Sequence, residues 1–377
     1  MPKPPKAHPN TGFAWLRMIG ALAVVIDHSA QLADPLRPTI FPLSWNLSFG
    51  YIALMGFFAM SGYQISDSWR EDPSWWRFSA KRVLRLWPPL LLVVLVTALV
   101  IGPLVSTLSL TEYVSTNSTW GYIVHNAGLY TLQHRLPGVF VNNPYPGSVN
   151  GSLWTLSMEL TGYLLVLAFG ALGLFRRTPW STIALLLALV GLNFRFEASA
   201  GNPGHGGLFL QVPIGSMVAF LVAFSLGMVL HTYRDRIPLS PLVAWSLVVL
   251  YIAVHSTKAE ALTLPFMAGY GAVVLANHWP ARLEGYDSWV FGSYGLYLWA
   301  YPIQQLLIMA GVGKPWPLAM AALPLSYLCG WLSWHYIEHP TLSLRRYLPN
   351  RDKHPYRDPG RPLDSDKHPY GASGGAA

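Results

Sequence analysis

Long apolar runs separated by short polar segments dominate this chain. A helix needs about 20 mostly apolar residues to cross the hydrocarbon core of a bilayer. Ten segments approach that length: 13–31, 46–66, 84–105, 152–174, 180–196, 212–231, 240–256, 261–278, 289–311 and 316–338. The pattern predicts an all-α, polytopic membrane protein with about ten transmembrane helices, contained in a domain of residues 1–340.

Two polar regions interrupt or follow these runs. Residues 106–150 form a long segment rich in Asn, Thr, Gly and Pro, which is typical of a loop. Residues 341–377 are rich in charge, Pro and Gly. Such a composition buries too little apolar surface to fold by itself, so we expect a disordered tail there.

The composition supports a membrane protein and excludes other classes. Only 11% of the 377 residues are charged, against about 25% in a soluble domain. High hydrophobicity excludes disorder for the bulk of the chain, and the single cysteine, Cys329, excludes a disulfide scaffold. The predicted partners therefore include membrane lipids.

The net charge of +8 reflects orientation rather than one basic patch. Outside the tail, twelve Lys and Arg residues flank the predicted spans on the side of the termini, and five lie at the other side. Basic residues accumulate on the cytoplasmic side of membrane proteins. The sequence thus predicts that both termini are cytoplasmic, and it gives no indication of a nucleic-acid partner.

Ionisable residues inside a span are costly and are candidates for function. Arg17 and His28 lie eleven residues apart in the first span. Three helical turns separate them, so they share one face about 16 Å apart along the axis. Arg17 would lie near the cytoplasmic end and His28 well across the membrane. The alternative is that Arg17 extends to the lipid headgroups and His28 only packs.

A second pair of cations enters the third span. Arg82 and Arg85 are three residues apart and project from one helix face. Two guanidinium groups suit phosphate oxygens, although ordinary positive-inside anchoring explains the pair as well. Glu159 lies about a third of the way into the fourth span. It must pair with a cation or line a wet cavity, and both interpretations are open.

One pattern resembles a metal site. Residues His335 to His339 match the H-x-x-E-H arrangement of some zinc enzymes. Pro340 follows at once, the segment ends a predicted span, and the sequence offers no other cluster of ligands to complete the site. We expect no metal.

Several of these segments together resemble membrane acyltransferase family 3, over about residues 12–340. Arg17 and His28 match its Arg, ten residues, His signature. Further matches follow in the family's order: Gly56–Tyr63, Phe78 with Lys81–Pro88, Leu153–Glu159, Ser293–Trp299 and Ile337–Pro340. Two positions depart from the pattern. Many members have His where this chain has Ala300, and a second Glu where it has Leu160.

The resemblance implies a function. It implies transfer of an acyl group, most readily acetyl, from cytoplasmic acyl-CoA to a hydroxyl of a sugar in a surface or lipid-linked glycan. The setting it implies is the inner membrane of a bacterium. Arg17, Arg82 and Arg85 would then bind the donor. His28 would act as general base or carry the acyl group transiently, and Glu159 would orient His28 or balance an arginine.

A different class also accounts for buried charge in ten spans. A transporter or flippase of a lipid-linked glycan would need Arg, His and Glu in its spans without any acyl transfer. Such proteins commonly show internal repeats or paired broken helices. The sequence shows no clear repeat between its halves, which favours the enzyme.

Overall fold

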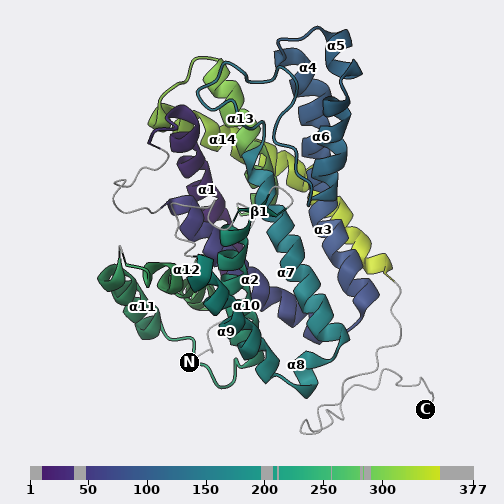
Figure 1. The fold of residues 1–377 in the computed structure, drawn as a ribbon. Coiled ribbons are helices and arrows are strands. Elements are labelled where there is room, and N and C mark those ends of the chain that lie inside the picture. Colours follow the sequence, from purple (N-terminus) through teal and green to yellow (C-terminus); the bar gives the residue numbers. More distant parts are fainter. Residues whose placement is uncertain are drawn as a thin grey trace, which may run out of the picture. The chain divides into compact units, whose positions relative to one another are not determined.

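All ten apolar segments coincide with helices in a computed structural model of the chain (Figure 1). The structure describes residues 11–37, 48–196, 207–209, 212–255, 257–280, 283 and 290–348. The ten helices are α1 (Thr11–Ala33), α2 (Phe49–Glu71), α3 (Trp75–Val96), α7 (Trp154–Ala171), α9 (Trp180–Phe196), α10 (Ile214–Thr232), α11 (Pro241–Val254), α12 (Glu260–Asn277), α13 (Ser293–Met309) and α14 (Pro315–Ser333).

Four of the described helical segments are long and apolar enough to cross a membrane. They are Thr11–Ala33, Trp75–Val105, Gly151–Ala171 and Ile214–Thr232. Two further apolar helices, α9 and α11, have 17 and 14 residues, fewer than the about 20 of a typical span. The all-α membrane character is therefore supported, and the ten-span arrangement stays a prediction.

Short elements extend or connect these helices. The π-helix η2 (Thr97–Ile101) and α4 (Gly102–Val105) continue α3, and the 3-10 helix η3 (Gly151–Leu153) leads into α7. Helix α8 (Leu174–Arg177) precedes α9, and strands β1 (Leu208–Phe209) and β2 (Val212–Pro213) pair antiparallel before α10. The π-helix η5 (Trp334–Glu338), α15 (His339–Ser343) and the 3-10 helix η6 (Leu344–Tyr347) follow α14.

The polar segment 106–150 contains two helices that its composition did not reveal. These are α5 (Leu110–Ser115) and α6 (Asn117–Gly128), which lie together beside α4 in Figure 1. Ser109 and Glu112 form a capping box: each side chain accepts a hydrogen bond from the other's backbone N–H. Such a box satisfies donors that a helix start leaves open, and it explains why a polar stretch begins a helix here.

Buried amides tie the second half of this segment to α13. Asn143 donates to the backbone and side-chain oxygens of Gln305, at 2.9 and 2.8 Å. Asn150 donates to the Leu298 carbonyl at 2.9 Å. The connection between α6 and α7 is therefore fixed to the bundle rather than free.

The compact unit formed by the helices ends at Arg345, and Arg346–Ala377 form a second unit. Helices α15 and η6 carry regular structure to Tyr347, into the segment predicted as a tail. The remainder of that prediction, residues 349–377, lies outside the described residues.

Helix α2 is central in the bundle, since it packs against α1, α7, α10 and α12. Its contact with α10 depends on two glycines. A methyl group at Gly227 would meet the Ala59 carbonyl oxygen and lie 2.8 Å from the Tyr63 nitrogen. A methyl group at Gly62 would meet the backbone of Phe224. The two backbones thus approach as only glycine permits, as in other close helix pairs in membranes.

We expect Gly227→Ala to destabilise the protein because it forces backbone apart at this contact. The loss in the free energy of unfolding should be about 1–3 kcal/mol, as for other overpacked sites. Thermal unfolding of the detergent-solubilised protein measures it. Gly271→Ala is the control, because the added methyl group has no atom within 4 Å. An unchanged melting temperature for Gly227→Ala would contradict the close-packing account.

Candidate functional site

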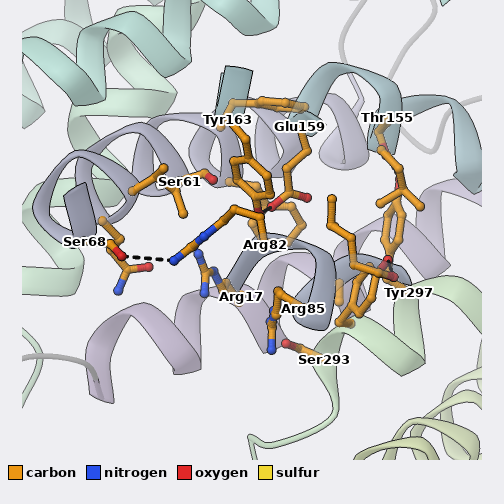
Figure 2. A pocket seen from close by; sticks show the side chains of 18 of the residues that line it. Arg17, Ser61, Ser68, Arg82, Arg85, Thr155, Glu159, Tyr163, Ser293 and Tyr297 are labelled. Carbon is orange, nitrogen blue, oxygen red and sulfur yellow. Dashed lines mark hydrogen bonds between the residues drawn. The ribbon is translucent and has the colours of Figure 1, made fainter. Parts of the chain in front are cut away.

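A cavity of about 290 Å³ lies among α1, α2, α3, α7, α13 and the segment after α14. Three of the arginines singled out in the sequence line it, and Figure 2 shows their side chains together in its middle. The polar side chains of the lining are Arg17, Ser61, Gln64, Ser68, Arg82, Arg85, Thr155, Glu159, Tyr163, Ser293, Tyr294, Tyr297 and Arg345.

Arg17 reaches the cavity from α1. Ala21, one turn later on the same face, lines it too. Among the residues that the structure describes, no carboxylate lies within 4 Å of the Arg17 guanidinium and no hydrogen bond to it is formed. An unpaired guanidinium inside a helix bundle is costly. Its position is explained best if an anion enters the cavity.

Arg82 is held from two sides. Its Nη2 donates to the Ser68 hydroxyl on α2 at 3.0 Å. Its guanidinium lies over the rings of Phe78 and Tyr163, 5.3 and 5.6 Å from their centroids. Its Nε is buried without a hydrogen-bond partner. Aromatic faces stabilise a cation without neutralising it, so the positive charge of Arg82 stays available.

Arg85 lies one helical turn away and has a different set of contacts. Its guanidinium is 5.7 Å from the Tyr294 ring centroid, and its Nη1 is 3.7 Å from Oε2 of Glu338. The neighbouring cations Arg77 and Lys81 instead form ion pairs with Asp72, where α2 turns into α3. The basic run at the start of α3 is thereby divided. One part is neutralised at the turn, and the other faces the cavity.

Glu159 faces the same cavity from α7. It accepts a hydrogen bond from the hydroxyl of Tyr163, one turn further along. Within the described part of the chain, it forms no ion pair with an arginine at 4 Å or less. Glu159 therefore lines a polar cavity, one of the two interpretations that the sequence left open.

The lining also contains a pair of hydrogen-bonded side chains, Thr155 and Tyr297. The Thr155 and Tyr297 hydroxyls are 2.7 Å apart, and Tyr297 also donates to the Ser152 carbonyl at 3.1 Å. One turn beyond Tyr297 on α13, the Tyr301 ring meets the His28 ring edge-on at a centroid distance of 5.2 Å. His28 does not line the cavity itself. On α1 it lies about two turns beyond Ala21, the last residue of that helix in the lining.

One ring nitrogen of His28, the buried Nδ1, has no hydrogen-bond partner among the described residues. The nearby residues of α1 and α13 are joined by Gln304, which donates to the Val25 carbonyl and to the Ser29 hydroxyl, each at 2.6 Å. His28 is thus on a firmly packed part of α1 with one ring atom free to accept or donate a proton.

The sequence did not single out several residues that the site uses. Arg345 falls in the predicted tail, yet it lines the cavity with Leu342. Ser68 and Tyr163 hold Arg82 and Glu159 but carry no charge that marks them in a sequence. Burial, together with the charges of Arg82 and Arg85, lowers the pKa of Arg345 to about 10. These side chains come from helices that are far apart in sequence, so only the folded structure shows that they lie close together.

Each carboxylate oxygen of Glu338 faces a polar group of the protein. Its side chain is 2% exposed. Oε1 accepts from the Gly295 N–H at 3.1 Å and from the Ser333 hydroxyl at 3.3 Å, and Oε2 faces Arg85. It lies on the π-helix η5, a conformation that is frequent at functional sites. The carboxylate of the H-x-x-E-H pattern therefore serves Arg85 and the start of α13.

The arrangement favours a polyanionic ligand. Four guanidinium groups line the cavity, and the described residues supply Glu159 in the lining and Glu338 behind Arg85 as their carboxylates. Guanidinium groups bind phosphate oxygens by paired, charge-assisted hydrogen bonds. No group of three His, Cys, Asp or Glu side chains in the described ranges is placed to hold a metal ion.

Comparison with known proteins shows the family of the chain. The model of the acyltransferase 3 family, described as an acyltransferase domain, matches residues 10–335, and the chain belongs to that family. The motif resemblance is thus confirmed. No solved structure matches the chain significantly.

Two curated relatives extend over nearly the whole chain. An O-acetyl transferase of Shigella phage Sf6 is 25% identical over 339 residues, which cover 88% of this chain and 96% of the relative. Nodulation protein 10 of Rhizobium leguminosarum bv. viciae is 28% identical over 370 residues, which cover 90% and 95%.

Glu338→Ala should destabilise the protein, because it leaves the Gly295 N–H and the Arg85 charge without their acceptor. We expect a loss of about 1–3 kcal/mol in the free energy of unfolding, measured by thermal unfolding in detergent. Glu338→Gln keeps an acceptor for Gly295 and should lose less. Glu71→Ala, at an exposed carboxylate on α2, is the control. Equal melting temperatures for Glu338→Ala and Glu71→Ala would show that these contacts contribute nothing.

Proposed function

We propose that this protein moves an acyl group, most readily acetyl, from acyl-CoA to a hydroxyl group of a sugar in a surface or lipid-linked glycan. Family membership and the O-acetyl transferase relative support O-acyl transfer. The observation that supports acyl-CoA as the donor is the cavity, which is lined by four arginines and one carboxylate. Coenzyme A carries several phosphate charges, which such a surplus of guanidinium groups would bind.

The length of the donor matches the distance between the arginines and His28. Arg17 lies about 16 Å from His28 along α1, and it shares the cavity with Arg82 and Arg85. Roughly thirteen bonds join the sulfur of coenzyme A to its nearest phosphorus. An extended chain advances about 3.6 Å for every three bonds, so this arm spans about 16 Å. A donor with its pyrophosphate at the arginines would bring its thioester past Tyr297 to His28.

At that point His28 would act on the acceptor. The imidazole takes the proton of the acceptor hydroxyl while the oxygen attacks the thioester carbonyl carbon. The carbon–sulfur bond then breaks, and the thiolate of coenzyme A receives the proton from His28. The products are the O-acyl sugar and free coenzyme A. A second route leads through acyl transfer to the imidazole, followed by attack of the hydroxyl on that intermediate.

The contacts of Glu159 support a role in balancing the positive charge of the cavity. It shares the cavity with Arg17 and Arg82 and is held by Tyr163. A carboxylate there offsets part of the positive charge, so that the donor binds without being held too tightly to leave. Because Glu159 accepts its hydrogen bond from Tyr163, we propose that it balances the arginines rather than orienting His28.

The membrane setting follows the charge pattern. We propose that both termini lie in the cytoplasm of a bacterium and that the chain crosses the inner membrane ten times. The arginine-lined cavity would then open toward the side where acyl-CoA is made. Acceptor sugars would approach His28 from the side of the 106–150 segment, which is fixed to α13.

His28→Ala should abolish acyl transfer and leave binding of coenzyme A unchanged, because the side chain lies beyond the phosphate-binding end. Transfer is measured as release of free coenzyme A from acetyl-CoA that depends on an acceptor extract. His125→Ala, at an exposed histidine of α6, is the matched control. Activity of His28→Ala at the wild-type rate would remove His28 from the mechanism. Radiolabel retained on wild-type protein without acceptor would select the covalent route.

Arg82→Ala and Arg85→Ala should each weaken binding of coenzyme A about tenfold or more, since each removes a charge-assisted contact worth roughly 1.5–3 kcal/mol. The acceptor KM should change less. Titration calorimetry on the purified protein measures donor affinity. Arg177→Ala, at an exposed arginine of α8, is the control for general loss of positive charge. If neither cavity variant alters the affinity, phosphate binding by these residues is wrong.

A further inference from the structure

The segment after α14 contributes to the cavity wall. Leu342 and Arg345, three residues apart, both line the cavity. They stand on α15 and η6, which follow directly from the π-helix that carries Glu338. The composition of this segment predicts a tail, and the function proposed above counts Arg345 among the lining arginines without giving it a role of its own. The question is what Arg345, which this segment adds to the cavity lining, would bind.

The position of Arg345 relative to α3 is fixed by one hydrogen bond. Its Nη2 donates to the Lys81 carbonyl at 3.2 Å. Lys81 precedes Arg85 by one helical turn, on the side of α3 where the helix begins. Elsewhere in the lining, Arg85 contacts the Tyr294 ring, and Tyr297 follows Tyr294 by about one turn of α13. Arg345 therefore lies beside the first turns of α3.

One nitrogen of the Arg345 guanidinium group, the buried Nε, has no hydrogen-bond partner among the described residues. No carboxylate of the described residues lies within 4 Å of its guanidinium. The carboxylate nearest in sequence to α3, Asp72, is engaged elsewhere, since it pairs with Arg77 and Lys81. A buried donor on an uncompensated cation is a site for an anion rather than for a structural ion pair.

We propose that Arg345 binds the phosphate of the donor that lies farthest from the acyl group, which in coenzyme A is the 3′-phosphate of the ribose. This inference rests on the proposed function. If the pyrophosphate lies at Arg17, Arg82 and Arg85 with the thioester directed to His28, the ribose lies outward of them. Arg345 is the lining cation that the segment after α14 adds beside the first turns of α3, and its planar guanidinium suits a phosphate monoester.

A comparison of two ligands tests the assignment. Coenzyme A and 3′-dephospho-coenzyme A differ only in the 3′-phosphate. Titration calorimetry gives the affinity of each for the full-length, detergent-solubilised protein. The wild type should bind coenzyme A about tenfold more tightly. Arg345→Ala should lose this preference and bind the dephospho ligand as the wild type does. Its unchanged affinity for that ligand shows at the same time that the cavity is intact.

Two further variants complete the design. Arg346→Ala removes an adjacent, exposed arginine whose guanidinium lies over the Tyr347 ring, and it should keep the full preference. Arg345→Lys keeps the charge but not the paired donors, and it should keep part of the preference. This variant serves the test if Arg345→Ala does not fold.

Each of the other possible results contradicts either the role of Arg345 or the proposed donor. An Arg345→Ala protein that still prefers coenzyme A tenfold refutes the inference and leaves the proposed donor intact. An equal loss of affinity for both ligands also refutes it, because Arg345 would then only support the fold of the cavity. A wild type that binds neither ligand overturns the proposed donor together with the role of Arg345.

Discussion

Positive charge enclosed by an apolar helix bundle is the constraint on which the rest of this structure depends. Four guanidinium groups share one cavity, and two carboxylates approach them. Removing an ion from water costs several kcal/mol unless it is paired. The protein meets this cost in part with the rings of Phe78, Tyr163 and Tyr294. The remainder is available to an anionic ligand, which the cavity would bind more strongly for that reason.

The surrounding fold holds these groups in place. Asp72 pairs with Arg77 and Lys81 at the turn between α2 and α3, so that the next cations along α3 face inward. The close contact of α2 with α10, set by Gly62 and Gly227, keeps the α2 wall of the cavity near α7. Glu338 connects the segment after α14 to Arg85 and to the start of α13. The contacts that stabilise the bundle thus also hold the arginines at the cavity.

Much of the architecture could be predicted from the sequence, because apolar length and helical period are local properties. The ten helices belong to this part. The sequence also singled out Arg17, Arg82, Arg85 and Glu159, but their meeting in one cavity depends on the packing of α1, α3 and α7. The helices α5 and α6 were missed because their residues are polar, and Arg345 because its neighbours resemble a tail. Those positions depend on caps and on contacts between segments far apart in sequence. The sequence also places His28 on the Arg17 face, but only the packing against Tyr301 shows that it lies beyond the cavity.

The central claim is that one donor molecule spans from the arginines to His28. The most direct measurement is an experimental structure of the protein with a non-hydrolysable acetyl-CoA analogue. The account predicts phosphates within hydrogen-bond distance of Arg17, Arg82 and Arg85, and the acyl end beside Tyr297 and His28. An analogue bound outside the cavity, or bound within it with its acyl end at the arginines, would contradict the account.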